Sequence, residues 1–175
     1  DFVSSSVEVF EERQLLSAAP VLNPNGNPTL NAINEDVANV ANTGTLVSNI
    51  IANMSPGGGI TDADPGALKG IAVIGANQMN GIWQFSVNGG ANWANFGATA
   101  PATALQLASN ASTRVHFIPN ANFNGTSALT FVAWDQTTGI NGAKAAATTR
   151  GGTTAFSINN ETATIAVNPV NDAPI

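Results

Sequence analysis

Cysteine is absent from the sequence, and charged residues make up only 9% of its 175 positions. Without cysteine the chain can form no disulfide, no zinc–thiolate site and no thiolate nucleophile, so stabilisation beyond core packing would have to come from hard cations. An average soluble domain carries about a quarter charged residues. We therefore expect a weakly charged surface whose polarity comes from residues such as Asn, Thr and Ser.

Basic residues are scarcer than acidic ones, with 5 Lys and Arg against 11 Asp and Glu and a net charge of −6. This charge repels phosphate backbones and anionic lipids, and no basic stripe offsets it, which excludes nucleic acid as a partner. Apolar runs stay well below the roughly 18 to 20 residues needed to span a bilayer, so we expect no membrane insertion. The first residues lack a basic and then apolar leader, and we expect a mature, soluble chain.

Motifs that position catalytic groups are also missing from the sequence. The chain has no Gly-x-Ser-x-Gly elbow, no His-Glu-x-x-His and no phosphate loop. Glycoside cleavage needs two carboxylates that face each other across a cleft, whereas the acids here fall in loop-like sequence. We predict that the protein is not an enzyme.

The sequence does contain a series of short runs rich in Val, Ile, Thr and Phe, separated by Gly, Asn and Pro clusters. No window combines helical spacing of apolar residues with credible caps. This pattern predicts an all-β fold, an antiparallel two-sheet β-sandwich. The expected strands are residues 30–34, 45–52, 70–75, 81–87, 92–96, 104–107, 113–118, 128–134 and 162–167.

Two segments fall outside this pattern. Residues 137–154 form a Gly-, Ala- and Thr-rich run that we interpret as a long mobile loop. Residues 1–20 precede the first strand and are interpreted as an extended arm, followed by a sandwich over 21–168 and a linker over 169–175. Alternate residues of the arm are apolar and would share one face of a strand. This strand could pair with a sheet edge of another copy. Its apolar candidates for polymerisation are Phe2, Val3, Val7, Val9 and Phe10.

Several carboxylates lie in turn-like sequence, and Lys and Arg are too few to pair with them. Asp62 and Asp64 stand two residues apart before Pro and Gly, where both side chains can point into one concavity. Ca²⁺ accepts about six to eight oxygen ligands in irregular geometry, so such loops suit it better than Mg²⁺ or Zn²⁺. The alternative is that these residues only form Asx-turns, and the sequence leaves both readings open.

A combination of segments resembles the cadherin-like tandem repeats of very large bacterial surface and adhesin proteins. The segments are Ile33–Asp36, Ile60–Asp64, Gly81–Ser86, Phe117–Thr126, Val132–Asp135 and Val167–Ile175. The resemblance covers about residues 19–175 and implies an immunoglobulin- or cadherin-like sandwich in an extracellular or cell-surface protein. It also implies Ca²⁺ as a cofactor at the junctions between successive domains.

The resemblance implies ligands at specific positions of this chain. An early Glu corresponds to Glu35, an acid-x-acid loop to Asp62 and Asp64, and the linker to Asn171 and Asp172; Asp135 is a further candidate. The linker departs from the pattern, because Pro169 stands where Asp is usual and one residue is missing. Fewer carboxylates imply weak binding, of roughly millimolar affinity. Residues 18–24 contain no acid, so no bridging ion is expected at that junction.

The three tryptophans and the single histidine each allow more than one role. Trp83, Trp93 and Trp134 could stack on sugar rings, but Trp83 shares a strand face with Phe85, so we expect at least one of the three to be a core anchor. His116 is the only histidine. It could be a metal ligand or a general base. Because the sequence has no second His, no Cys and no nucleophile motif beside it, we favour a simple solvent-facing side chain.

Three functions follow from these observations. The leading one is a structural or adhesion module that uses Ca²⁺ to stiffen its loops and linker, with neighbouring copies or repeats as partners. The first alternative is a filament subunit that polymerises by donating its N-terminal strand. The second is a carbohydrate-binding module, with cell-surface glycans as partners.

Overall fold

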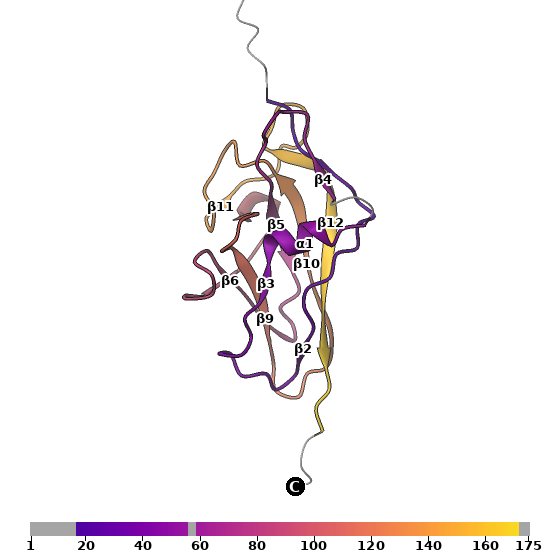
Figure 1. Ribbon diagram of the computed structural model, residues 1–175, viewed down its shortest axis with the longest axis vertical. Coiled ribbons are helices and arrows are strands. Elements are labelled where there is room, and N and C mark those ends of the chain that lie inside the picture. The colour runs from indigo at the N-terminus through magenta and orange to yellow at the C-terminus, as the bar shows by residue number, and fades with distance from the viewer. Residues whose placement is uncertain (1–16, 56–58, 172–175) are drawn as a thin grey trace, which may run out of the picture.

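The computed structural model of the protein describes residues 17–55 and 59–171. In this part the chain is mostly β-structure with one short α-helix and one 3-10 turn (Figure 1). The elements in order are β1 (Val21–Leu22), β2 (Ile33–Asn34), β3 (Thr45–Leu46), α1 (Val47–Ala52), β4 (Ile60–Thr61), β5 (Gly70–Ala76), β6 (Gly81–Ser86), β7 (Ala94–Asn95), η1 (Pro101–Thr103), β8 (Ala104–Ala108), β9 (Arg114–Pro119), β10 (Gly125–Trp134), β11 (Lys144–Ala145) and β12 (Phe156–Asn168).

The strands form three sheets. One has six strands in the order β11-β8-β5-β10-β12-β2, one has four in the order β3-β9-β6-β7, and one pairs β1 with β4. The named strands pair antiparallel throughout, except that β2 runs parallel to the end of β12. The edge strands of the two larger sheets are only two residues long, which leaves little open edge for pairing with another chain.

The main core lies between the two larger sheets. Ile71 and Phe131 from the six-stranded sheet join Trp83 and Phe117 from the four-stranded sheet in one buried cluster. The rings of Trp83 and Phe117 have centroids 5.1 Å apart. The indole Nε1–H of Trp83 donates to the carbonyl of Asn77 at 2.9 Å, so the polar atom of this large side chain is satisfied inside the core.

The six-stranded sheet is also covered on its other face. Trp134, Val132 and Ala72 form a second buried cluster together with Ala147. The indole Nε1–H of Trp134 donates to the carbonyl of Thr138 at 2.7 Å. The segment 137–154, expected to be a long loop, therefore includes the short strand β11 and packs against the sheet instead of standing apart from it.

The helix α1 corrects the sequence prediction of a strand over 45–52. Only Thr45 and Leu46 form β3, and the chain then turns into a helix that buries Val47, Ile50 and Ile51. Met54 follows in the same spacing and is 1% exposed. Apolar residues at i, i+3, i+4 and i+7 are typical of a helix, but the β-branched residues in this run also suit a strand. Burial of one helix face decides between them.

The remaining strands differ from expectation mainly in length. The predictions for β5, β6, β8 and β9 are right to within two residues at each end, whereas β2 and β7 are reduced to two residues each. β12 is much longer than expected, because its first residues, from Phe156, continue the antiparallel pairing with β10 as far as Trp134. The short strands β1, β4 and β11 were not predicted at all.

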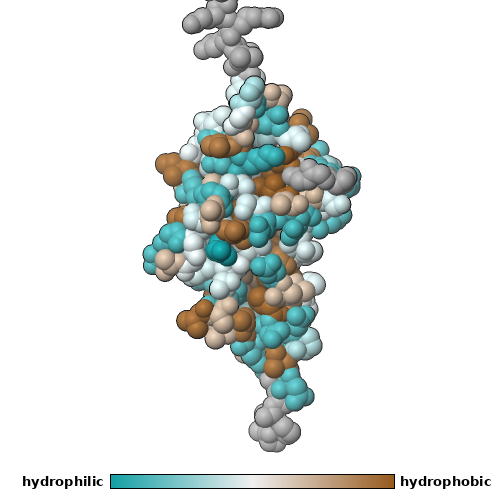
Figure 2. Space-filling model, viewed as in Figure 1, coloured by the Kyte–Doolittle hydropathy of each residue, from teal (hydrophilic) through white to brown (hydrophobic). Residues whose placement is uncertain are grey.

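The described chain is elongated, and its two ends leave from opposite extremes of the long axis (Figure 1). Exposed apolar side chains such as Val40 and Met79 are dispersed, and Figure 2 shows brown and teal residues interleaved on the viewed face. No helix in residues 17–55 and 59–171 has the length and apolar character that crossing a bilayer requires.

Candidate functional site

Asp64 fastens the incoming N-terminal connection to the body of the protein. Its Oδ2 accepts hydrogen bonds from the backbone N–H of Ala18 at 2.8 Å and from the hydroxyl of Ser17 at 3.1 Å. Asp62 shapes the same loop, since its Oδ1 accepts from the backbone N–H of Asp64 at 2.9 Å. Asp62 therefore makes an Asx-turn, whereas Asp64 bonds to the N-terminal segment.

Asp135 lies at the end of β10, next to the Asp64 loop. A hollow of about 240 Å³ is lined by residues 64–68 from one side and by Asp135 and Thr137 from the other. Asp135 is 3% exposed, and its Oδ1 accepts from the backbone N–H of Thr137 at 2.8 Å and from the Thr137 hydroxyl at 2.6 Å. The end of the molecule that carries Ser17 therefore brings Asp64 and Asp135 to one hollow.

Two carboxylate oxygens at this end lack a hydrogen-bond partner among the described residues. They are Oδ2 of Asp62 and Oδ2 of Asp135, and both atoms are buried. A buried acceptor without a partner costs about 1–3 kcal/mol, and more when it is charged. These are the atoms at this end that a cation or a water molecule would satisfy.

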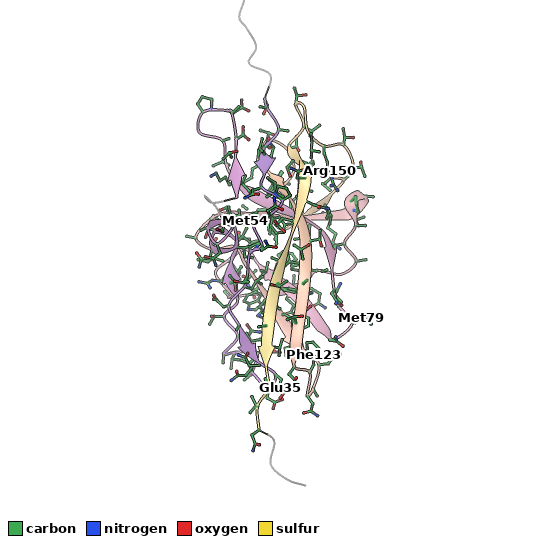
Figure 3. The ribbon with its side chains drawn as sticks, turned by 90° about the vertical axis from the view of Figure 1, so that its right-hand side faces the viewer. Glu35, Met54, Met79, Phe123 and Arg150 are labelled. Atoms are coloured by element: carbon green, nitrogen blue, oxygen red, sulfur yellow. The ribbon has the colours of Figure 1, made fainter. Side chains whose placement is uncertain are left out.

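Glu35 holds the outgoing connection at the opposite end of the molecule, where Figure 3 labels it beside the departing chain. Its Oε1 accepts from the backbone N–H of Val170 at 2.7 Å, and its Oε2 accepts from the side-chain amide of Asn124 at 3.3 Å. Its own backbone N–H donates to the carbonyl of Asn168 at 3.0 Å. Glu35 is 7% exposed, and both of its oxygens have partners within the chain.

The structure thus divides the predicted ligands between two ends. Glu35 and the exposed Asn171 lie at the outgoing end, and Asp62, Asp64 and Asp135 lie at the incoming end. Within the described ranges no three His, Cys, Asp or Glu side chains are placed to hold a metal ion together. Glu35 therefore does not lie with Asp62, Asp64 and Asp135. Asp172 and the arm residues Phe2, Val3, Val7, Val9 and Phe10 lie outside the described residues.

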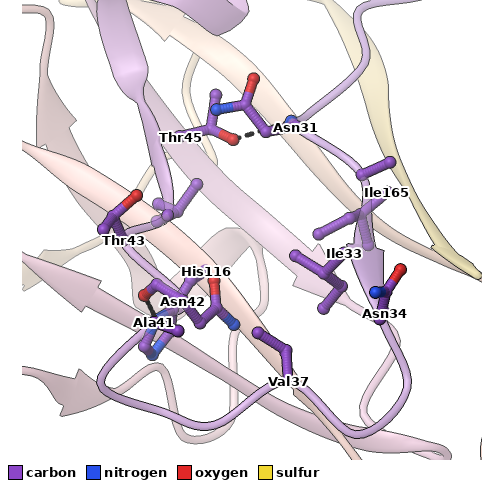
Figure 4. Close-up of a pocket in the computed structure, with 13 residues that line it drawn as sticks. Asn31, Ile33, Asn34, Val37, Ala41, Asn42, Thr43, Thr45, His116 and Ile165 are labelled. Atoms are coloured by element: carbon purple, nitrogen blue, oxygen red, sulfur yellow. Dashed lines mark hydrogen bonds between the residues drawn. The ribbon is translucent and has the colours of Figure 1, made fainter.

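His116 also departs from expectation, because it is buried instead of facing solvent. It is 2% exposed, and the Trp93 ring stacks on it with centroids 3.6 Å apart and an interplanar angle of 5°. Its Nδ1 lies 3.0 Å from the carbonyl oxygen of Asn42, a contact drawn in Figure 4, and its Nε2 lies 2.8 Å from Oε1 of Gln84. Burial lowers the pKa of His116, and the contact with the Asn42 carbonyl opposes this only in part.

The three tryptophans have different environments. Trp83 and Trp134 are 0% and 1% exposed, which confirms that at least one Trp anchors the core. Trp93 is the exception, since it remains part-exposed beside its stacked histidine. The surface loop that carries Asn42 lies next to it.

One functional carboxylate was missed by sequence reasoning. Glu161 is 7% exposed on β12, and its Oε2 accepts from the backbone N–H of Gly26 at 2.7 Å. It holds the N-terminal segment against the last long strand, 135 residues away in sequence. The signal was present, because Glu161 falls on the same alternation as the buried Ala163, Ile165 and Val167.

Comparison of this chain with family models, with curated proteins and with solved structures gives no match.

Proposed function

We propose that the protein is an extracellular structural or adhesion domain of a bacterial surface protein, with a cadherin-like two-sheet sandwich fold. In this role it acts as one stiff unit in a row of neighbouring copies or similar repeats. One observation carries the proposal: the incoming and outgoing connections leave from opposite ends, and a carboxylate fastens each of them, Asp64 at one end and Glu35 at the other.

This arrangement suits a mechanical role because it fixes the direction in which each connection leaves the domain. A hydrogen bond to a charged acceptor contributes about 1.5–3 kcal/mol, enough to hold a short connection in one direction most of the time. At the outgoing end, β2 adds a parallel pairing of Ile33 with Val167 just before the linker.

The proposal includes Ca²⁺ at the incoming end, where Asp62, Asp64 and Asp135 would supply part of a site that the described residues of one copy do not form alone. The unpartnered buried oxygens of Asp62 and Asp135 support this location. Three carboxylates alone do not complete the six to eight oxygens that Ca²⁺ takes. In a head-to-tail row, the end carrying Asn171 of the preceding copy would supply further oxygens, so the ion would bind at the contact between two domains.

The filament alternative receives less support from the described residues. Strand donation needs a long open sheet edge, and the edge strands β2, β3, β7 and β11 are two residues each. Beside β12, residues 28–34 run along the strand, with the N–H of Leu30 donating to the Thr164 carbonyl at 2.8 Å. A donated strand would have to displace this segment.

Two copies fused head to tail through the natural linker would test the proposal by small-angle X-ray scattering. We expect a stiff, extended particle whose maximum dimension is close to twice that of one copy and which becomes more flexible in the Glu35→Gln variant. Asp36→Asn, on the exposed neighbour of Glu35, is the matched control and should leave the profile unchanged. A fused pair that behaves as two freely jointed units in wild type would overturn the proposal.

A further inference from the structure

Trp93 presents part of its ring to solvent in a position that the neighbouring residues hold fixed. His116 covers one face of the indole in a parallel stack at 3.6 Å, and the side chain as a whole is half-buried, so part of the ring stays open to solvent. Gly44 lies close to this arrangement, because a Cβ there would lie 2.6 Å from the carbonyl oxygen of Val115 and 2.8 Å from Cη2 of Trp93. The backbone of Gly44 also has φ +68°, a region that L side chains rarely adopt.

The loop beside Trp93 separates two hollows. One, of about 340 Å³, is lined by Trp93 together with Asn39, Val40 and Thr43 and by the backbone of Gly89. The other, of about 260 Å³, lies on the far side of the loop and is shown in Figure 4 with Asn42 and Thr43 on its wall. Asn42 and Thr43 line both, so the loop forms a ridge between two shallow depressions.

The polar groups around the Trp93 hollow are neutral. None of the residues that line it carries a charge. Asn39 and Thr43 are exposed, and neither side chain makes a hydrogen bond to another described residue. Arg114 lies beside the loop and donates from its Nη1 to the backbone carbonyl of Thr43 at 3.3 Å.

We propose that this hollow binds a neutral sugar ring of a glycan. A pyranose presents C–H bonds on one face, which pack against an indole, and hydroxyl groups around its edge, which bond to amide and hydroxyl side chains such as Asn39 and Thr43. The absence of charge in the lining disfavours acidic sugars and phosphate esters. A protein partner would need roughly 800 Å² of contact surface on each side, far more than one hollow offers. Rigid stacking on His116 lowers the ordering cost of binding. Sugar binding at Trp93 does not depend on the end-to-end arrangement proposed above.

Native gel electrophoresis in the presence of soluble polysaccharides tests this inference. The probes are three neutral polymers, hydroxyethyl cellulose, glucomannan and dextran, and one acidic polymer, alginate. We expect at least one neutral polymer to retard the wild-type chain, and Trp93→Ala to weaken that retardation about tenfold or more. Met79→Ala is the matched control, since Met79 is 84% exposed and lies outside the hollow. Its retardation should equal that of wild type.

Acrylamide quenching of fluorescence tests the same inference without a variant, because Trp83 and Trp134 are buried and Trp93 is the accessible indole. Saturation with an oligosaccharide of the retarding polymer should reduce quenching in the wild-type chain. Trp93→Phe should restore part of the retardation that Trp93→Ala loses. The inference is overturned if none of the neutral polymers retards the wild type or if only alginate does. It is also overturned if the Trp93→Ala variant is retarded as strongly as the wild type.

Discussion

The carboxylate of Glu35 accepts a hydrogen bond of 2.7 Å from the backbone N–H of Val170, which joins residues 135 positions apart at the outgoing end of the molecule. The family resemblance implied a metal-ligand role for Glu35; in the structure both of its carboxylate oxygens accept hydrogen bonds from the chain. Because Glu35 is 7% exposed, this contact is shielded from competing water.

Replacing Glu35 by Gln should destabilise the protein by about 1–3 kcal/mol. The variant loses the charge of the acceptor, and its amide group would face the side-chain amide of Asn124 or the N–H of Val170, donor against donor. Urea denaturation measures the loss, and hydrogen exchange at the Val170 amide should accelerate by more than exchange in β10. Unchanged protection of that amide would show that Glu35 does not hold the linker.

The effect of Asp135→Asn on the melting temperature should depend on whether Ca²⁺ is present. With chelator present, removal of a buried charge that has an unpartnered oxygen should leave the melting temperature equal or slightly higher. With millimolar Ca²⁺, wild type should gain stability and the variant should not. Differential scanning calorimetry measures both. Asp36→Asn serves as the control. If the wild-type melting temperature is equal in Ca²⁺ and in chelator, the proposed Ca²⁺ site is contradicted.

Acidification should weaken the fold between about pH 7 and pH 5 through His116. Its burial lowers its pKa below the ordinary value of 6.5, so the unfolded chain takes up the proton at higher pH than the folded chain does. The stabilising contribution of neutral His116 is complete above the unfolded pKa and is lost as the pH falls through the folded pKa. Free energies of unfolding from urea titrations should therefore decline over this interval.

His116→Gln provides the comparison for this pH dependence. His116 is the only histidine, and carboxylates titrate mainly below pH 5, so the decline should flatten in the variant. A wild-type chain that gains stability on acidification from pH 7 to pH 5.5 would contradict the assigned direction of the pKa shift.

The helix α1 can be checked with two substitutions at Asn49, an exposed position in its middle. Ala has a higher helix propensity than Val, whereas Val suits a strand better than Ala. We expect Asn49→Ala to be more stable than Asn49→Val by about 0.5 kcal/mol in thermal or urea denaturation. The opposite order would favour the strand that the β-branched residues of this run suggest.

Local patterns of the sequence were sufficient for β6 and β9, whose core-facing residues recur with period two, and for β5 and β8, which are short apolar runs buried on both faces. The same rule indicated that at least one of the three tryptophans anchors the core, as Trp83 and Trp134 do. It failed at α1, where Val47, Ile50 and Ile51 satisfy a helical period with residues that also favour strands. The surface available for packing decides between a helix and a strand here.

The sequence by itself determined the β-rich class, the weak surface charge and the presence of acids in turns, since composition and short-range spacing are local properties. Tertiary structure decided which acids meet. Asp64 and Asp135 share a hollow although 71 positions separate them, whereas Glu35 lies at the far end and holds Val170. It also decided that His116 is buried, because the covering side chain, Trp93, and the Asn42 loop come from other parts of the chain. Such contacts depend on sheet topology, and topology is set by the free energy of packing the whole core and not by any single segment.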